Sequence, residues 1–171
     1  MIPVPSQTTL RQKITKIGST AVLALLGLSL VACSPTVPLK PAKYASSVEC
    51  AEVIVRLSED IGEFKRLDTN AQGTAAWGNP SSAIQVRCGL EMPVASDQLC
   101  TTVDGVDWLA DGSDDPIYVF VSYGRDPAVE VIVDNEVVTG RTALDFISQA
   151  VKVLPQKHKC LSIGDLEQPK P

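Results

Sequence analysis

The apolar and polar positions of this chain follow two periods, and these periods predict a helix near each end of a run of strands. Apolar residues recur at helical spacing over Val48–Ile61, with Ser46 or Ser47 as the N-cap and Gly62 as the stop. A second helical pattern covers Thr142–Leu154, directly before a proline. Each pattern gathers its apolar residues on one side, so we expect each helix to pack against the rest of the domain.

Strand patterns occupy the region between the two helices. Alternation over Ala83–Cys88 predicts a half-buried strand, and Ile117–Tyr123, which is apolar on both faces, is the expected central strand. The pair Asp104-Gly105 predicts a two-residue hairpin turn, because such a turn needs positive φ at both positions. An acidic loop is expected over Ala110–Asp115. The other expected strands are residues 64–67, 99–103, 106–109, 129–133 and, as a short addition, 137–138.

The order of these elements predicts a single α+β domain. A helix, several strands and a final helix are typical of a mainly antiparallel sheet that the N- and C-terminal helices cover on one face. We expect the domain to span residues 48–165, followed by a tail over residues 166–171. Its length of about 120 residues suits one hydrophobic core.

The first 32 residues have the pattern of a bacterial lipoprotein signal peptide. Three basic residues precede the uncharged apolar run Ala21–Ala32, which is too short for a comfortable membrane span. The sequence Leu30-Val31-Ala32-Cys33 matches a lipobox, in which the cysteine is acylated and becomes the first residue of the mature protein. We therefore expect Cys33 to anchor the protein by lipid on the extracytoplasmic face of the cell membrane.

Residues 33–47 read as the lipidated cysteine and a proline-rich, extended tether. Removal of residues 1–32, which hold three of the 15 basic and none of the 20 acidic residues, changes the formal charge from −5 to −8. Because phosphate binding needs clustered lysine and arginine, nucleic acid is not an expected partner.

Four further cysteines, Cys50, Cys88, Cys100 and Cys160, predict two disulfides in an exported chain. No pair has the short spacing of zinc ligands and the one histidine is His158, so neither a metal nor another cofactor is expected. Three pairings are possible. We favour Cys88–Cys100, which closes a local loop, and Cys50–Cys160, which ties the two ends of the domain together.

The sequence has no recognisable catalytic constellation, and we assign no catalytic residue. Nucleophile-elbow, zinc-protease and phosphate-loop patterns are all missing from it. A solvated acidic turn is the favoured interpretation of a cluster of five carboxylates, although calcium binding or glycoside hydrolysis by two of them are alternatives. The cluster consists of Asp104, Asp107, Asp111, Asp114 and Asp115.

A candidate binding surface combines scarce aromatic residues with arginines that could present a planar anion-binding fork. Trp108 follows Asp107 at the end of the predicted hairpin, where the two could line a recognition groove. The alternative for Trp108 and Trp77 is a place in the core. The candidate surface consists of Arg87, Asp107, Trp108, Tyr123 and Arg125.

Several short motifs resemble an uncharacterised family of actinobacterial secreted proteins and lipoproteins, domain-of-unknown-function family 3515. The motifs are Trp77–Pro80, Arg87–Gly89, Cys100 with Val103–Trp108, and Tyr123–Val131. The likeness runs from about Cys50 to the C-terminal helix. It implies a cell-envelope protein of Gram-positive-type bacteria, with no activity, substrate or cofactor attached.

These observations together favour a lipid-anchored envelope protein that binds or scaffolds. Its expected partners are the membrane, through the anchor, and an envelope protein or cell-wall ligand. The alternatives are a carboxylate-dependent hydrolase of cell-wall glycan and a purely structural envelope component.

Overall fold

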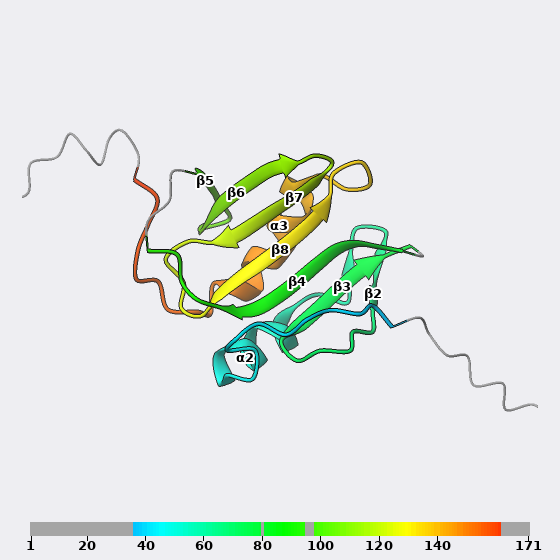
Figure 1. Cartoon of the computed structure of the whole chain (residues 1–171), viewed down its shortest axis with the longest axis horizontal. Helices are drawn as coiled ribbons and strands as arrows, with labels where there is room; N and C mark the ends of the chain where they lie inside the picture. The colour runs from blue at the N-terminus through cyan, green and yellow to red at the C-terminus, as the bar shows by residue number, and fades with distance from the viewer. Residues whose placement is uncertain (1–35, 80, 95–97, 162–171) are drawn as a thin grey trace, which may run out of the picture. The chain divides into compact units, whose positions relative to one another are not determined.

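The computed structural model describes residues 36–79, 81–94 and 98–161 (Figure 1). This part of the chain folds into one eight-stranded sheet and two helices, α2 and α3. The expected signal peptide, Cys33 and the C-terminal tail lie outside it. The elements are α2 (Val48–Arg56), β1 (Asp60–Ile61), β2 (Phe64–Leu67), β3 (Thr74–Gly78), β4 (Ser82–Leu90), β5 (Leu99–Val103), β6 (Val106–Asp114), β7 (Ile117–Ser122), β8 (Ala128–Asp134) and α3 (Gly140–Val151).

The sheet consists of two four-stranded meanders joined at their last strands. Its order is β1-β2-β3-β4-β8-β7-β6-β5, and every neighbouring pair is antiparallel. The junction pairs Val86 of β4 with Val131 of β8. The mainly antiparallel sheet, the two helices and the presence of two disulfides confirm the expected α+β class. None of the helices in the described residues has the length and apolar character needed to cross a bilayer.

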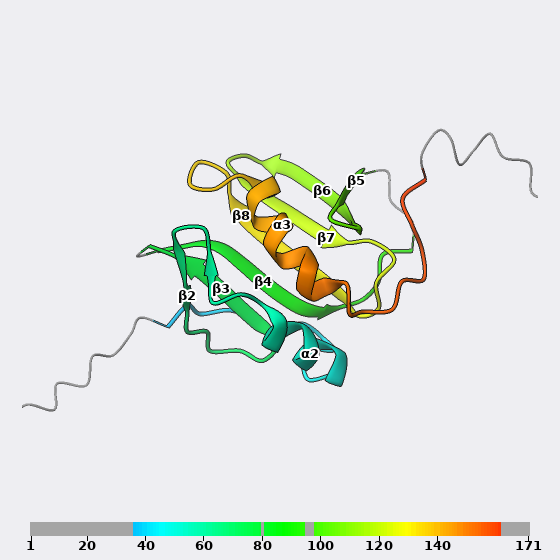
Figure 2. The ribbon, with the colours of Figure 1, turned by 180° about the vertical axis from the view of Figure 1, so that it is seen from behind.

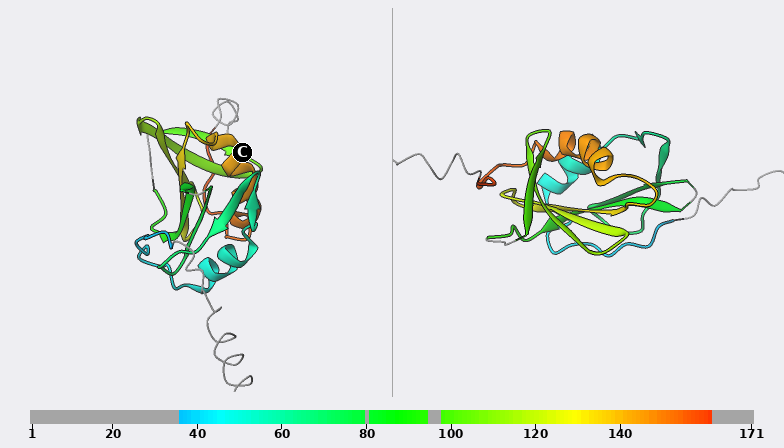
Figure 3. Two further views of the ribbon diagram at one scale, coloured as in Figure 1. Left: turned by 90° about the vertical axis from the view of Figure 1, so that its right-hand side faces the viewer. Right: turned by 90° about the horizontal axis from the view of Figure 1, so that it is seen from above.

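The hydrophobic core forms where alternate side chains of the strands meet the two helices. Val86, Val131 and Trp108 are fully buried on the sheet, and they cluster with Val53 of α2 and Ile147 of α3. The helices pack against each other, while α2 contacts β4 and α3 contacts β8. Figure 2 shows α3 in front of β7 and β8, and Figure 3 shows the two helices side by side.

Local turn and cap chemistry follows the sequence closely. Asp104 and Gly105 have φ values of 47° and 75°, which confirms the predicted two-residue hairpin turn. The Ser47 hydroxyl accepts a hydrogen bond from the Cys50 N–H at 3.2 Å and caps α2, so the second of the two candidate serines is the N-cap.

Several expected elements differ from the structure. The second helix spans Gly140–Val151 rather than residues 142–154, and the strand expected at the centre of the sheet is β7, whereas β4 and β8 form the centre. The first helix ends at Arg56, because Leu57 is extended and residues 60–61 pair with β2 as β1. The acidic loop expected over Ala110–Asp115 is wrong: β6 continues to Asp114, and its pairing with β7 holds these residues in the sheet. Residues 137–138 form part of a turn rather than a strand.

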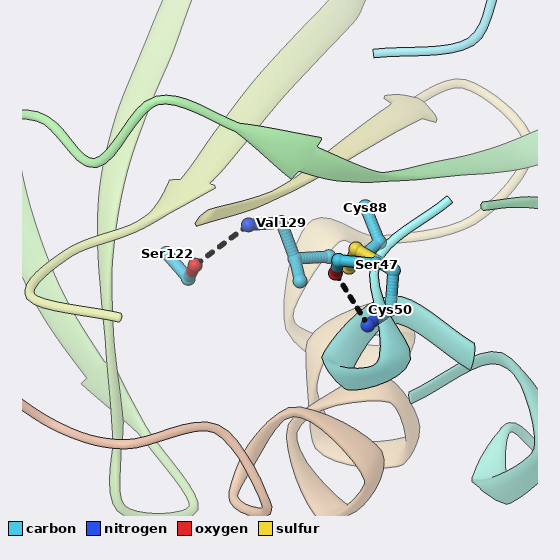
Figure 4. Close-up of a disulfide and its surroundings, with 5 residues drawn as sticks. All are labelled: Ser47, Cys50, Cys88, Ser122 and Val129. Carbon is cyan, nitrogen blue, oxygen red and sulfur yellow. Dashed lines mark hydrogen bonds between the residues drawn. A yellow bond between two sulfur atoms is a disulfide. The ribbon is translucent and has the colours of Figure 1, made fainter. Parts of the chain in front are cut away.

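The disulfide pairing favoured from the sequence is wrong. The bonds are Cys50–Cys88 (Figure 4), with 5.5 Å between Cα atoms, and Cys100–Cys160, with 6.0 Å. Cys88 and Cys100 cannot pair because β4 and β5 lie four strand spacings apart, about 19 Å. They also face opposite sides of the sheet. Cys88 lies two residues after Val86 on β4 and therefore shares its core face. Cys100 pairs with Leu109, which adjoins the core residue Trp108 on β6 and therefore lies on the opposite face.

The N-terminal segment Val37–Ala45 lies on the domain, although the sequence predicts an extended tether up to residue 47. The Val37 N–H donates to the Asp68 carbonyl at 2.8 Å, and the Tyr44 N–H donates to the Gly89 carbonyl at 2.9 Å. Ala45 is buried. The segment therefore runs from the loop after β2 to the start of α2 (Figure 1).

Candidate functional site

The structure does not gather the five predicted surface residues on one exposed patch. Trp108 is fully buried in the core, and its indole N–H donates to the Ser148 hydroxyl of α3 at 3.1 Å. Its neighbour Asp107 points to the opposite side of the sheet, because successive side chains of a strand alternate between faces. Trp77 is also fully buried, so both tryptophans lie in the core, which was the alternative to a place on the binding surface.

Arg125 is a structural residue at the C-terminal end of α3. Its guanidinium donates to the carbonyls of Lys152 and Leu154, and to the carbonyl of Gly105 at 3.3 Å. A cation at this end of a helix interacts favourably with the helix dipole. Burial lowers the pKa of Arg125, while the nearby Asp107 carboxylate acts in the opposite direction.

Asp107 and Tyr123 hold the C-terminal segment Pro155–Leu161 on the face of the sheet away from the core. The buried Asp107 carboxylate accepts hydrogen bonds from the Thr102 hydroxyl at 2.6 Å and from the Cys160 N–H at 2.9 Å. The Tyr123 ring lies 6.4 Å from the ring of His158. These residues serve the docking of the segment that carries the second disulfide.

Arg87 forms an ion pair in the middle of the sheet, away from the C-terminal segment. Its Nε and Nη2 donate to the two carboxylate oxygens of Glu130 at 2.7 and 3.0 Å, and Glu130 is its direct cross-strand partner. The Glu130 carboxylate raises the pKa of Arg87. The Arg87 guanidinium and the Glu130 carboxylate thus bind each other through these two hydrogen bonds.

Three of the five carboxylates in the acidic cluster, those of Asp104, Asp107 and Asp111, have separate local partners. Asp104 accepts from Lys152 Nζ at 2.7 Å and from the Gln149 amide, and Asp111 accepts from the Ser113 N–H at 2.9 Å. That backbone hydrogen bond lowers the pKa of Asp111. Within the ranges that the structure describes, no group of three or more His, Cys, Asp or Glu residues could hold a metal ion.

A different place in the molecule has the form of a ligand site. It is an open cleft of about 510 Å³ where the start of α2, the end of β4 and the turn between β7 and β8 meet. We call it the acidic cleft. The residues that line it are Tyr44, Ser47, Glu49, Glu91, Met92, Asp126 and Pro127.

The acidic cleft combines three carboxylates with an apolar lining. Glu91 pairs with Lys43 at 2.5 Å, and Asp126 pairs with Lys157 at 2.5 Å. The hydrogen bond from Lys43 lowers the pKa of Glu91. Glu49, in the first turn of α2, makes no ion pair with another described residue. The cleft therefore retains a negative charge that a cationic ligand could meet.

The apolar part of the acidic cleft comes from Tyr44, Met92 and Pro127. The Lys43 ammonium lies 5.1 Å from the centre of the Tyr44 ring, and this side chain is exposed. Ligand sites commonly place a few polar groups in an apolar lining. This arrangement suits a ligand with an ammonium or guanidinium group next to an apolar portion.

Sequence reasoning missed the acidic cleft because three distant segments build it. The available signals were a serine N-cap before an acidic first turn, a glutamate directly after the strand that ends at Leu90, and the Asp126-Pro127 turn. None of them indicates a site by itself, and the order of the strands brings them together.

Comparison with known proteins identifies a family but no characterised relative. A family model described as "Protein of unknown function (DUF3515)" matches residues 19–159, which is most of the chain. No curated protein and no solved structure matches.

Proposed function

We propose that this chain, which belongs to the DUF3515 family, is a lipid-anchored binding protein of the cell envelope whose ligand site is the acidic cleft. Lipid anchoring is supported by the lipobox at Cys33 and by the leader before it, in which basic residues precede an uncharged apolar run. The two disulfides support an oxidising compartment outside the cytoplasm. The cleft itself is the observation that carries the binding role.

The ligand in this proposal carries a cationic group beside an apolar one, as in a basic peptide segment of an envelope protein. Glu49 offers the carboxylate for the cation, while Met92 and Pro127 offer the apolar contact. Near the cleft, the Cys50–Cys88 bond joins the start of α2 to β4 (Figure 4), so little conformational entropy is lost when a ligand binds.

The proposal also places α2 and α3 over one face of the sheet, which the views in Figures 2 and 3 support.

Binding has better support than hydrolysis of glycan. A glycosidase needs one carboxylic acid that remains protonated near neutral pH beside a second, ionised carboxylate. In the acidic cleft, Lys43 lowers the pKa of Glu91 and so favours its ionised form. In the predicted acidic cluster, Asp104 and Asp107 are engaged by α3 and by the C-terminal segment.

A titration followed by NMR tests the binding role. The probe is the acetylated dipeptide amide Ac-Lys-Phe-NH₂, and Ac-Glu-Phe-NH₂, which has no amino group, is the anionic control. We expect Ac-Lys-Phe-NH₂ to shift the backbone amide signals of Glu49, Glu91 and Met92. The anionic dipeptide should leave these signals in place.

Two matched variants place the interaction in the cleft. Glu49→Gln removes the unpaired carboxylate, and we expect it to weaken binding roughly fivefold, which corresponds to about 1 kcal/mol for one exposed ion pair. Glu63→Gln changes an exposed glutamate between β1 and β2, outside the cleft, and should bind like the unmodified protein. Equal weakening in both variants, or signal shifts elsewhere in the domain, would contradict the proposal.

A further inference from the structure

We propose that the anchor holds the domain in one orientation, with the loop between β2 and β3 toward the membrane and the acidic cleft directed away from it. This inference rests on the proposed acylation of Cys33. It adds a membrane-facing surface, which neither the sequence pattern nor the family assigns. The surface is the region around Val37, Asp68 and Thr69, and we call it the anchor edge.

The first step concerns the length of chain between Cys33 and the docked segment. The Val37 N–H donates to the Asp68 carbonyl at 2.8 Å, and Val37 forms a parallel bridge with Thr69. Only residues 34–36 separate Val37 from Cys33. Four residue steps span at most about 14 Å, whereas the 15-residue tether expected from the sequence would span about 50 Å.

This short connection limits how the domain can turn. A domain of about 120 residues is roughly 35 Å across. A connection of at most about 14 Å is less than half of that width, so the far side of the domain cannot reach the membrane surface. The anchor edge must therefore stay close to the bilayer.

The second step concerns the strength with which the segment is held. The Leu39 N–H donates to the Asn70 side chain at 2.8 Å, in addition to the backbone bond at Tyr44. Ala45 packs directly over two glycines. A Cβ built on Gly73 would lie 2.8 Å from the Ala45 carbonyl oxygen, and one on Gly89 would lie 2.4 Å from the Ala45 nitrogen. The backbone of the segment is thus seated where no side chain could fit.

The third step concerns direction. The segment begins at the anchor edge beside Val37, and it ends at Tyr44, which lines the acidic cleft. Figure 1 shows it running along the sheet without doubling back. The five extended steps from Val37 to Ala42 correspond to roughly 17 Å. The cleft consequently lies at the opposite end of this segment from the anchor.

Energy transfer to the membrane tests the orientation in the full, matured protein. A donor dye is attached through p-azidophenylalanine, either in place of Asp68 at the anchor edge or in place of Val48 beside the cleft; both residues are exposed. The protein is reconstituted into phosphatidylglycerol vesicles that contain a rhodamine-labelled lipid as acceptor. We expect transfer from position 68 to be about twofold more efficient, because in the proposed orientation the docked segment separates the two labels by roughly 17 Å along the membrane normal.

A lengthened tether is the matched control. Twelve Gly/Ser residues inserted after Thr36 leave the docked segment unchanged but free the domain to rotate. We expect the two transfer efficiencies to become equal in this variant. Equal efficiencies with the native tether, or higher transfer from position 48, would overturn the orientation. If the vesicles float in a density gradient and the protein does not float with them, the anchoring itself would be refuted, and the orientation with it.

Discussion

Replacement of Arg125 by methionine separates a structural role from the surface role that the sequence predicts. Methionine keeps much of the side-chain length but removes the donors to the carbonyls of Lys152, Leu154 and Gly105. Hydrogen bonds from charged groups contribute about 1.5–3 kcal/mol each, and those to Lys152 and Gly105, at 3.4 and 3.3 Å, belong at the lower end. The variant also avoids the desolvation cost of a buried cation. The expected net loss of unfolding free energy is about 3 kcal/mol.

Urea unfolding under non-reducing conditions measures this loss, with the fluorescence of the buried Trp77 and Trp108 as the signal. Arg141→Met is the control, because Arg141 is exposed and pairs with Asp145 on the surface of α3; its expected effect is below about 0.5 kcal/mol. Arg125→Lys should not restore stability, because a compact ammonium cannot reproduce the guanidinium fork, in which Nη1 donates to Lys152 and Leu154 and Nη2 donates to Gly105. A change below about 1 kcal/mol in Arg125→Met would refute the capping role.

Three further predictions concern other parts of the domain. Peptide mapping without reduction should recover the Cys50–Cys88 bond, and replacing both cysteines by alanine should cost about 4 kcal/mol for a loop of 38 residues; a Cys50–Cys160 peptide would contradict the structure. Lys43→Met should raise the pKa of Glu91 toward its ordinary value in an NMR pH titration, and an unchanged value would argue against the ion pair. Gly124→Ala should speed hydrogen exchange in the C-terminal segment, because its Cβ would lie 2.0 Å from a carbonyl oxygen there; unchanged protection would show that the segment is held differently.

Local patterns in the sequence predicted local structure well. The Asp104-Gly105 turn and the strands β7 and β8 depend on residues that are close in the chain, so periodicity and turn chemistry suffice to find them. The same alternation could have assigned Trp108 to the core: it shares a strand face with Val106, and both are fully buried. Adjacent positions 107 and 108 of one strand cannot line the same surface.

Contacts between distant parts of the chain could not be predicted in this way. The order of the strands puts β4 next to β8 and places β5 at the far edge, and this order decides which cysteines meet. It also brings Glu49, Glu91 and Asp126 around one cleft. Nothing in the local sequence of the N-terminal segment shows that it docks, since the partners of Val37 and Tyr44 are backbone carbonyls.

Mass spectrometry of the protein extracted from its native membrane tests the central claim most directly. The account predicts an N-terminal peptide that begins at Cys33 and carries a diacylglyceryl group on the sulfur. An N-terminus that retains residues 1–32, or an unmodified Cys33 thiol, would contradict it.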